Sequence, residues 1–397
     1  MGTILNRTRL FFIVSFLAKA LQIPLAVGKS QSNSLCAELI WPKGYPCDEI
    51  TVETADGFLL GLQHIPFGVA GPSDIPGPAV LLVHGLTAGG DNYVVNDPKE
   101  DLALILADAG FDVYIGSNRN TRWSHGSSKY KPEEKAYWDW TLDELAAFDV
   151  PAFVEYVYNK RGGSKIFYIG HSQGTLTLMA GLTGGGTAAE QMKDKLRGVV
   201  FLAPVAYVTH LSAALVGLLF NTYADQILPL VGIGPADSRI LISSVCKLNA
   251  DACSDLLRGY IGTNSYLNST RRPTYLKYFP QPTSSYNLNH FGQIKRSEKF
   301  GKYDRGPKEN LERYGQEEPP LYQLAKFPSE SFPQLFFTGG IDQLADPSDT
   351  KRLLQELPTS GVREVINLPE YGHGDFVLAQ RANIDVYSKI VSFFKSN

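Results

Sequence analysis

The stretch at residues 166–176 restricts the fold of this chain more than any other part of its sequence. It reads Ile-Phe-Tyr-Ile-Gly-His-Ser-Gln-Gly-Thr-Leu, which is a short apolar run, a Gly-x-Ser-x-Gly pattern and a segment able to continue as a helix. A serine hydroxyl is a poor nucleophile unless its oxygen projects to where a base and a carbonyl carbon can reach it. A sharp turn from strand to helix projects Ser172 in this way, and it crowds the backbone so closely that glycine is needed at Gly170 and Gly174. The same turn directs the N–H of Gln173 toward the position where an oxyanion would form.

A chance match is the alternative reading of this pattern, because the chain contains 37 glycines. The surroundings favour the functional reading, since apolar runs alternate with segments of helical periodicity on both sides of it. Continuous apolar runs are typical of parallel strands that are buried on both faces, so the expected class is α/β with a mostly parallel sheet. An exposed antiparallel hairpin is expected before them, with Asp56-Gly57 as its turn. Strands are expected at residues 49–54, 58–64, 79–83, 111–115, 166–169, 198–204, 334–338 and 362–368. Helices are expected at residues 101–109, 138–158, 173–182, 348–356 and 385–396.

The alternation of strands and helices stops after Pro204 and resumes near residue 334. The segment between is too long for an unstructured loop in a compact domain. We therefore expect an inserted, mainly helical cap over the carboxyl edge of the sheet, with residues 211–231 either lining an acyl pocket, touching a lipid surface or simply packing on the core. The predicted division is residues 1–30 as a signal peptide, 31–204 as the first part of the core, 205–330 as the cap and lid, and 331–397 as the second part of the core.

The first 30 residues have the features of a targeting segment. Arg7 and Arg9 precede an apolar run at residues 10–17, and small residues follow near positions 26–30. Lys19 interrupts the apolar stretch, so a spanning helix of ~20 residues is not expected. We predict a secretory signal peptide, with an uncleaved anchor as the alternative, and no transmembrane segment in the mature chain. The expected destination is the extracellular space, or else the vacuole or another lumen of the secretory pathway.

Four cysteines form two pairs that are close in sequence, Cys36 with Cys47 and Cys246 with Cys253. An even number at short spacing behind a signal peptide favours two disulfides, while free thiols in a reducing compartment are the alternative. A metal site is the weakest interpretation, because neither pair has the Cys-x-x-Cys spacing. Asn268-Ser-Thr is an acceptor sequence for N-linked glycosylation, which agrees with secretion.

The charge pattern excludes one class of partner. The 37 basic and 40 acidic residues give a net charge of −3, and neither sign forms a long run. Nucleic acid is therefore not expected as a partner, because phosphate binding needs a concentrated basic face.

Three residues stand in the order Ser, Asp, His that an α/β-hydrolase places at the ends of its strands. Ser172 follows the fifth expected strand, Asp342 follows the strand at residues 334–338, and His373 follows the last strand. His373 would take the Ser172 proton and later deliver it to the leaving alcohol. Asp342 would hold the imidazole tautomer and stabilise the imidazolium. The loop after residues 79–83 would supply a second oxyanion donor, the N–H of Leu86.

Other residues compete for two of these roles. Asp346 is the alternative acid, but it precedes a proline and could cap the following helix instead. Asp375 is too close to His373 in sequence to be preferred. His84 beside the oxyanion loop is expected to have only a supporting role. The remaining histidines do not follow the last strand: His64, His125, His171, His210 and His290.

Several motifs beyond the serine turn carry a family resemblance. They are Gly170-His-Ser-Gln-Gly174, Leu202-Ala-Pro-Val-Ala206, Gly339-Gly-x-Asp342-x-Leu-Ala-Asp-Pro347, Tyr371-x-His373-x-Asp-Phe376, Gly44-Tyr45, Thr54-x-Asp56-Gly57-Phe58 and Trp138-Asp-Trp-Thr-x-Asp-Glu144. From about residue 44 to its end the chain resembles the acid lipases of the gastric and lysosomal type, and as a whole it resembles their plant relatives. One departure is Asn120, because relatives usually carry glycine after the arginine that corresponds to Arg119.

The resemblance implies an α/β-hydrolase fold with an inserted cap and lid at residues 205–330. It implies Ser172, Asp342 and His373 as the catalytic triad, Leu86 and Gln173 as the oxyanion donors, and Cys246 with Cys253 as the family's cap cysteine pair. The expected activity is hydrolysis of a lipid ester at a lipid–water interface, foremost triacylglycerol. A sterol-ester or other ester hydrolase, an acyltransferase with the same triad, and an inactive binding protein are the alternatives. Serine, histidine and water suffice for this chemistry, so no cofactor and no metal are expected.

Overall fold

The computed structural model describes residues 34–185, 187–230 and 250–397. The predicted signal peptide and the pairing of Cys246 with Cys253 lie outside the described residues. Among the described helices, none is long and apolar enough to cross a membrane.

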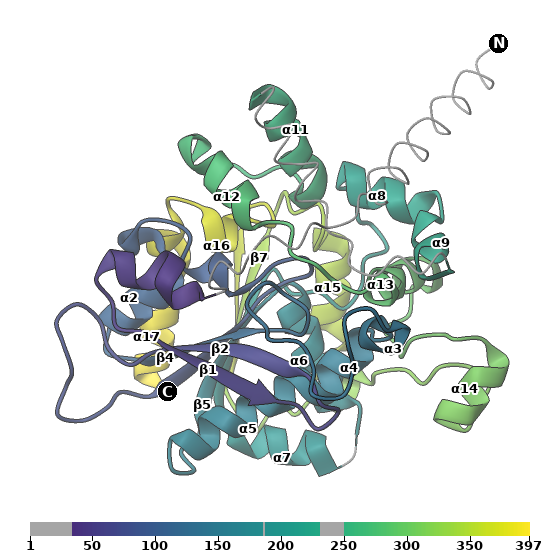
Figure 1. Ribbon diagram of the computed structural model, residues 1–397, viewed down its shortest axis with the longest axis horizontal. Coiled ribbons are helices and arrows are strands. Elements are labelled where there is room, and N and C mark those ends of the chain that lie inside the picture. Colours follow the sequence, from purple (N-terminus) through teal and green to yellow (C-terminus); the bar gives the residue numbers. More distant parts are fainter. Residues whose placement is uncertain (1–33, 186, 231–249) are drawn as a thin grey trace.

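A single sheet forms the centre of the molecule (Figure 1). It has eight strands in the order β1-β2-β4-β3-β5-β6-β7-β8. β1 pairs antiparallel with β2, and β2 pairs antiparallel with β4, while every other neighbouring pair is parallel. The expected α/β class with a mostly parallel sheet is therefore confirmed. The strands are β1 (Asp48–Glu53), β2 (Leu59–Ile65), β3 (Ala79–Val83), β4 (Asp112–Ser117), β5 (Ile166–His171), β6 (Leu196–Leu202), β7 (Gln334–Gly339) and β8 (Arg363–Leu368).

Helices cover both faces of this sheet, which is why its central strands are apolar along their whole length. Every residue of β3, β4 and β5 is buried. On one face, Phe394 of the C-terminal helix α17 (Ser388–Ser396) stacks on Phe167 of β5 with ring centroids 4.1 Å apart. On the other face, Phe153 of α5 (Val150–Lys160) packs against Gly116 of β4. Further helices of the core are α2 (Leu102–Asp108), α3 (Lys135–Trp138), α4 (Leu142–Glu144), α6 (Gln173–Thr183), α7 (Thr187–Lys195), α15 (Pro347–Glu356) and α16 (Asp375–Leu378).

The helical stretch expected at residues 138–158 is broken into pieces. Thr141 caps α4 through a capping box with Glu144. A π-helical turn at Leu145–Asp149 follows and leads without a break into α5, which contains Pro151 near its start. Other short turns of 3-10 or π type lie at Cys36–Ile40, Trp41–Lys43, Gly90–Tyr93, Pro98–Glu100, Ser269–Arg271, Leu324–Lys326 and Asn383–Tyr387.

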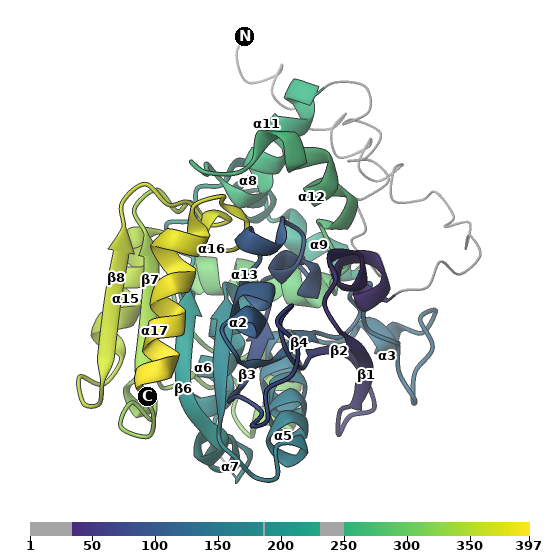
Figure 2. The ribbon, with the colours of Figure 1, turned by 90° about the vertical axis from the view of Figure 1, so that its left-hand side faces the viewer.

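The segment between β6 and β7 differs from the rest of the fold. Its described residues contain helices and no strand. Figure 2 shows α8, α11 and α12 above the carboxyl ends of the strands, where the loops that follow β3, β5 and β7 also lie. The limits proposed for this cap, residues 205–330, stay a prediction. The helices are α8 (Ala214–Asn221), α9 (Ala224–Leu230), α11 (Ala250–Ile261), α12 (Arg272–Tyr278), α13 (Ser285–Ser297) and α14 (Pro307–Tyr314).

Of the two predicted disulfides, one is present in the described residues. Cys36 and Cys47 are bonded, with their Cα atoms 5.5 Å apart. The bridge ties the first described turn to the start of β1.

Candidate active site

Ser172 lies alone between β5 and α6, at the sharp turn that the sequence indicates. Its φ of 53° and ψ of −117° belong to a region that residues with a side chain rarely adopt. A Cβ atom on Gly170 would come within 2.7 Å of the backbone of Gly174, and one on Gly174 within 2.2 Å of the Val83 carbonyl oxygen. Both glycines are thus required by close backbone approach. Gln173 occupies the first position of α6, where a backbone N–H has no partner within the helix.

Asp342 and His373 are brought together by the loops that follow β7 and β8. Nδ1 of His373 lies 2.9 Å from Oδ2 and 3.1 Å from Oδ1 of Asp342, and both side chains are buried. A carboxylate only accepts hydrogen bonds, so Nδ1 carries the proton and Nε2 is left with its lone pair. The N–H groups of Leu344 and Ala345 each donate to Oδ1 of Asp342 at 2.9 Å, which fixes the carboxylate in place.

The two competing carboxylates have other partners. Asp346 caps α15 by accepting the N–H of Ser348 at 2.7 Å. Asp375 accepts backbone N–H groups from Gly372, Ser265 and Tyr266, and burial raises its pKa. Asp375 therefore fastens the loop that carries His373 to the segment after α11.

One cavity of about 500 Å³ reaches both Ser172 and His373. Ser172, His171, His373 and Leu86 all border it. Its wall is mostly apolar, as suits a pocket for a hydrocarbon chain. Side chains from the helical segment after β6 supply much of this wall, among them Leu215, Leu219, Phe220, Leu257, Phe279 and Phe291.

His84 holds the loop after β3 through two hydrogen bonds to the backbone. Its Nδ1–H donates to the Gly85 carbonyl at 2.8 Å, and its Nε2 accepts the N–H of Asn118 at 3.0 Å. Burial lowers its pKa to about 4, so the ring is neutral and keeps both bonds. Farther along this loop, the Thr87 carbonyl accepts the N–H of Gln281 at 2.6 Å, so the loop is fastened on both sides of Leu86.

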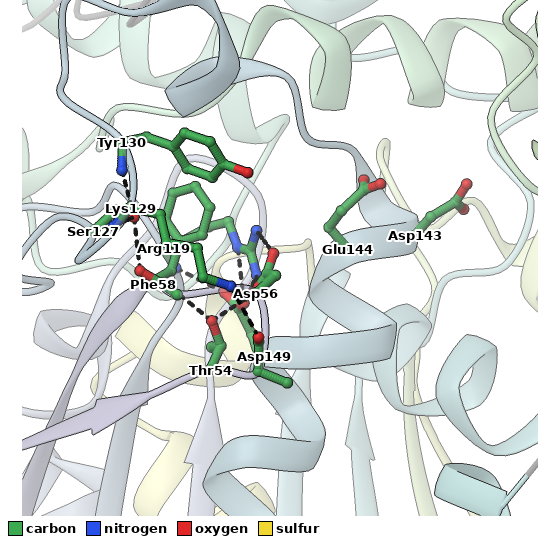
Figure 3. Close-up of polar contacts among 12 residues, drawn as sticks. Thr54, Asp56, Phe58, Arg119, Ser127, Lys129, Tyr130, Asp143, Glu144 and Asp149 are labelled. Atoms are coloured by element: carbon green, nitrogen blue, oxygen red, sulfur yellow. Dashed lines mark hydrogen bonds and ion pairs between the residues drawn. The ribbon is translucent and has the colours of Figure 1, made fainter.

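An ion-pair network lies beside Asn118 and is drawn in Figure 3. The side chain of Arg119 is fully buried and donates to Asp149 from Nε and Nη2, at 2.8 and 2.6 Å. It also donates to Asp56 from Nη1 and Nη2, at 2.7 and 3.0 Å, and its guanidinium carbon lies 4.0 Å from the centre of the Phe58 ring. The next residue, Asn120, has a φ of 61°. Asparagine tolerates this left-handed conformation, so the backbone turns here without a glycine.

Sequence reasoning missed two contacts of the site. Asn287 of α13 accepts a hydrogen bond from the side-chain amide of Gln173 at 3.0 Å, which joins the first turn of α6 to the segment after β6. His171 donates to the backbone of His373. No local pattern signals either contact, because the partners are more than a hundred residues apart.

The other histidines lie away from the cavity. His64 pairs with Asp112, His210 with Asp349, and His290 with the Gly301 carbonyl. Of the described histidines only His171 and His373 line the cavity.

Comparisons with known proteins agree with this fold. The family described as alpha/beta hydrolase fold matches residues 78–380, and the partial alpha/beta-hydrolase lipase region matches residues 36–97. Triacylglycerol lipase 1 of Arabidopsis thaliana is 39% identical over 372 residues, covering 92% of each chain. Gastric triacylglycerol lipase of Homo sapiens is 33% identical and covers 93% of each chain.

The chain belongs to the acid lipase family. The expected family and α/β-hydrolase fold are thereby confirmed, and the family places the chain among ester-hydrolysing enzymes. A solved monoglyceride lipase from Saccharomyces cerevisiae has the same fold, with a TM-score of 0.55 at 16% identity over 89% of this chain and 96% of its own.

Proposed function

We propose that this acid lipase hydrolyses carboxylic esters of lipids, foremost triacylglycerol, through an acyl intermediate on Ser172. One observation carries the proposal. The strained serine and His373 border one apolar cavity, and the ring of His373 is hydrogen-bonded to Asp342 behind it. The relatives named triacylglycerol lipases support the choice of triacylglycerol over other esters.

The mechanism follows from the lone pair on Nε2 of His373, which the hydrogen bond to Asp342 leaves available. Oγ of Ser172 attacks the ester carbonyl carbon while Nε2 of His373 takes its proton, and Asp342 stabilises the imidazolium that results. The negative charge moves to the carbonyl oxygen, where the N–H groups of Leu86 and Gln173 donate to it. His373 then protonates the leaving alcohol as the C–O bond breaks, which leaves an acyl group on Ser172. Water, deprotonated by His373, attacks this acyl group and releases the fatty acid.

The cavity suits a hydrocarbon chain, and the helices after β6 form the part of the wall that such a chain would touch. We further propose that the substrate is taken from a lipid–water interface, and that the enzyme acts outside the cell or in a lumen of the secretory pathway. Asn268, whose side chain is partly exposed, would carry a glycan there.

The test measures fatty acid released from emulsified long-chain triacylglycerol, from a soluble short-chain ester and from a sterol ester. The wild type is compared with Ser172→Ala, and circular dichroism verifies that the variant is folded. We expect activity on the emulsion and its loss in the variant. Activity on the soluble ester alone would limit the proposal to an esterase, activity foremost on the sterol ester would change the substrate, and activity that persists in Ser172→Ala would refute the nucleophile.

A further inference from the structure

His171 precedes the serine and is in contact with the loop of the catalytic histidine. Its Nε2 lies 3.0 Å from the backbone carbonyl oxygen of His373, and the two imidazole rings are 5.0 Å apart. A carbonyl oxygen only accepts, so Nε2 of His171 must carry the proton. Burial lowers the pKa of His171 to about 3, so the ring is neutral and holds this single N–H.

The second ring nitrogen of His171, Nδ1, makes no comparable hydrogen bond. Nδ1 of His171 is buried without a hydrogen-bond partner in the described part of the chain, and it lies 3.4 Å from the position that a Cβ atom on Gly85 would take. A buried polar atom without a partner lowers stability, and a phenyl ring of similar size would avoid this penalty. Packing therefore does not explain an imidazole here, whereas its Nε2–H bond to His373 does.

The hydrogen bond from His171 joins the turn that carries Ser172 to the loop that carries His373, and other contacts hold each of these separately. Ser172 is fixed by the turn between β5 and α6. The loop of His373 is fixed mainly from the segment after α11, through Asp375 and through Asn264, whose side chain accepts the N–H of Gly374 at 2.7 Å. Between residues 166–176 and 369–378, both fully described, the bond from His171 is the one hydrogen bond.

We propose that His171 is a positioning residue, whose Nε2–H holds the backbone of His373 at a fixed distance from Ser172. It transfers no proton and acts only through His373. This inference rests on the proposed function, because the distance it fixes is the one over which His373 takes the Ser172 proton. Since a misplacement of about 1 Å can lower a rate ~100-fold, one hydrogen bond at this point has a measurable effect.

Three substitutions at the same position test the role. In His171→Gln the amide nitrogen falls where Nε2 was, so the donor is kept. In His171→Asn the amide nitrogen falls where Nδ1 was and cannot reach His373. His171→Phe fills the space without any donor. We expect kcat to fall about 10- to 100-fold in the Asn and Phe variants and less than about threefold in the Gln variant, with KM within about threefold of the wild type in all three.

A second measurement needs no substrate. The proton shared by His373 and Asp342 gives a low-field ¹H NMR resonance, which is identified by its absence in His373→Ala. We expect this resonance to be unchanged in His171→Gln and to broaden or disappear in His171→Phe, because a loosened loop lets water exchange with the proton. Thermal unfolding of each variant verifies that it is folded.

The outcomes separate this proposal from the one on which it rests. Equal kcat values and equal resonances in the Gln and Phe variants would overturn the positioning role, even if Ser172→Ala is inactive. A loss of kcat that is the same in all three variants would also overturn it, since the donor would then not matter. If the wild type hydrolyses no ester, the proposed function fails, and the resonance alone decides whether His171 orders the His373 loop.

Discussion

The buried pair of Arg119 and Asp149 allows a prediction of stability that the structure makes quantitative. Asp149→Asn has nearly the shape of the native side chain, so it leaves no cavity, but it removes the charge that compensates a fully buried guanidinium. Breaking a buried pair by removing one partner costs about 3–5 kcal/mol. Asp56 keeps its two hydrogen bonds to Arg119, and its side chain is 23% exposed, so we expect the lower end, about 3 kcal/mol.

The assay is urea unfolding at pH 7, followed by tryptophan fluorescence, with a thermal melt beside it. For a chain of 397 residues, an unfolding entropy of about 2 cal/mol/K per residue converts this loss to a melting temperature lowered by about 4 °C. Arg313→Ala is the control, because it breaks an exposed ion pair. The side chains of Arg313 and Glu309 are 42% and 44% exposed. Such a pair contributes less than about 1 kcal/mol. If Asp149→Asn is no less stable than the control, the argument from burial is wrong.

Two further predictions concern carboxylates near the site. Asp342→Asn should lower kcat about 10⁴-fold, because the amide no longer holds the proton on Nδ1 of His373, whereas Asp346→Asn should change kcat little, since asparagine also caps a helix. Steady-state kinetics on the soluble ester decides between them, and the reverse ranking would contradict the assignment. Burial raises the pKa of Asp91 to about 6 despite the hydrogen bonds that it accepts from Trp123 and Gln281. Its folded-state pKa lies above the unfolded value, so the wild type gains stability through this group as the pH falls from about 6 toward 4. Asp91→Asn lacks this gain. The difference in unfolding free energy between the variant and the wild type should therefore become less favourable to the variant by about 2–3 kcal/mol from pH 7 to pH 4. Parallel pH curves of the two proteins in urea unfolding would refute this.

The elements of the core could be predicted from the sequence because their signals are local. The apolar run of β3 and the run before Ser172 are buried on both faces, so each shows its strand within five or six residues. The two glycines around Ser172 are required by contacts within the same turn and with the strand beside it.

The choice between Asp342 and Asp346 depends on contacts that no short stretch of sequence can predict. Both follow β7, and the sequence ranks them by their distance from the strand and by the proline after Asp346, which makes that residue a candidate helix cap. The folded chain gives the two carboxylates different partners, since the loop after β8 brings Nδ1 of His373 to Asp342 while Asp346 accepts the N–H of Ser348. That contact depends on the parallel register of β7 with β8, which no short stretch of sequence contains.

Tertiary structure alone decided the surroundings of Ser172. The hydrogen bonds from Gln173 to Asn287 and from His171 to His373 span 114 and 202 residues. The cavity wall likewise combines side chains from the core with side chains from the helices after β6. The sequence by itself determined which strand and which turn present the serine, because chain geometry and backbone crowding act over a few residues. Only the folded chain decided which carboxylate, amide and imidazole meet there, because their free energy comes from burial and contacts between segments that are distant in sequence.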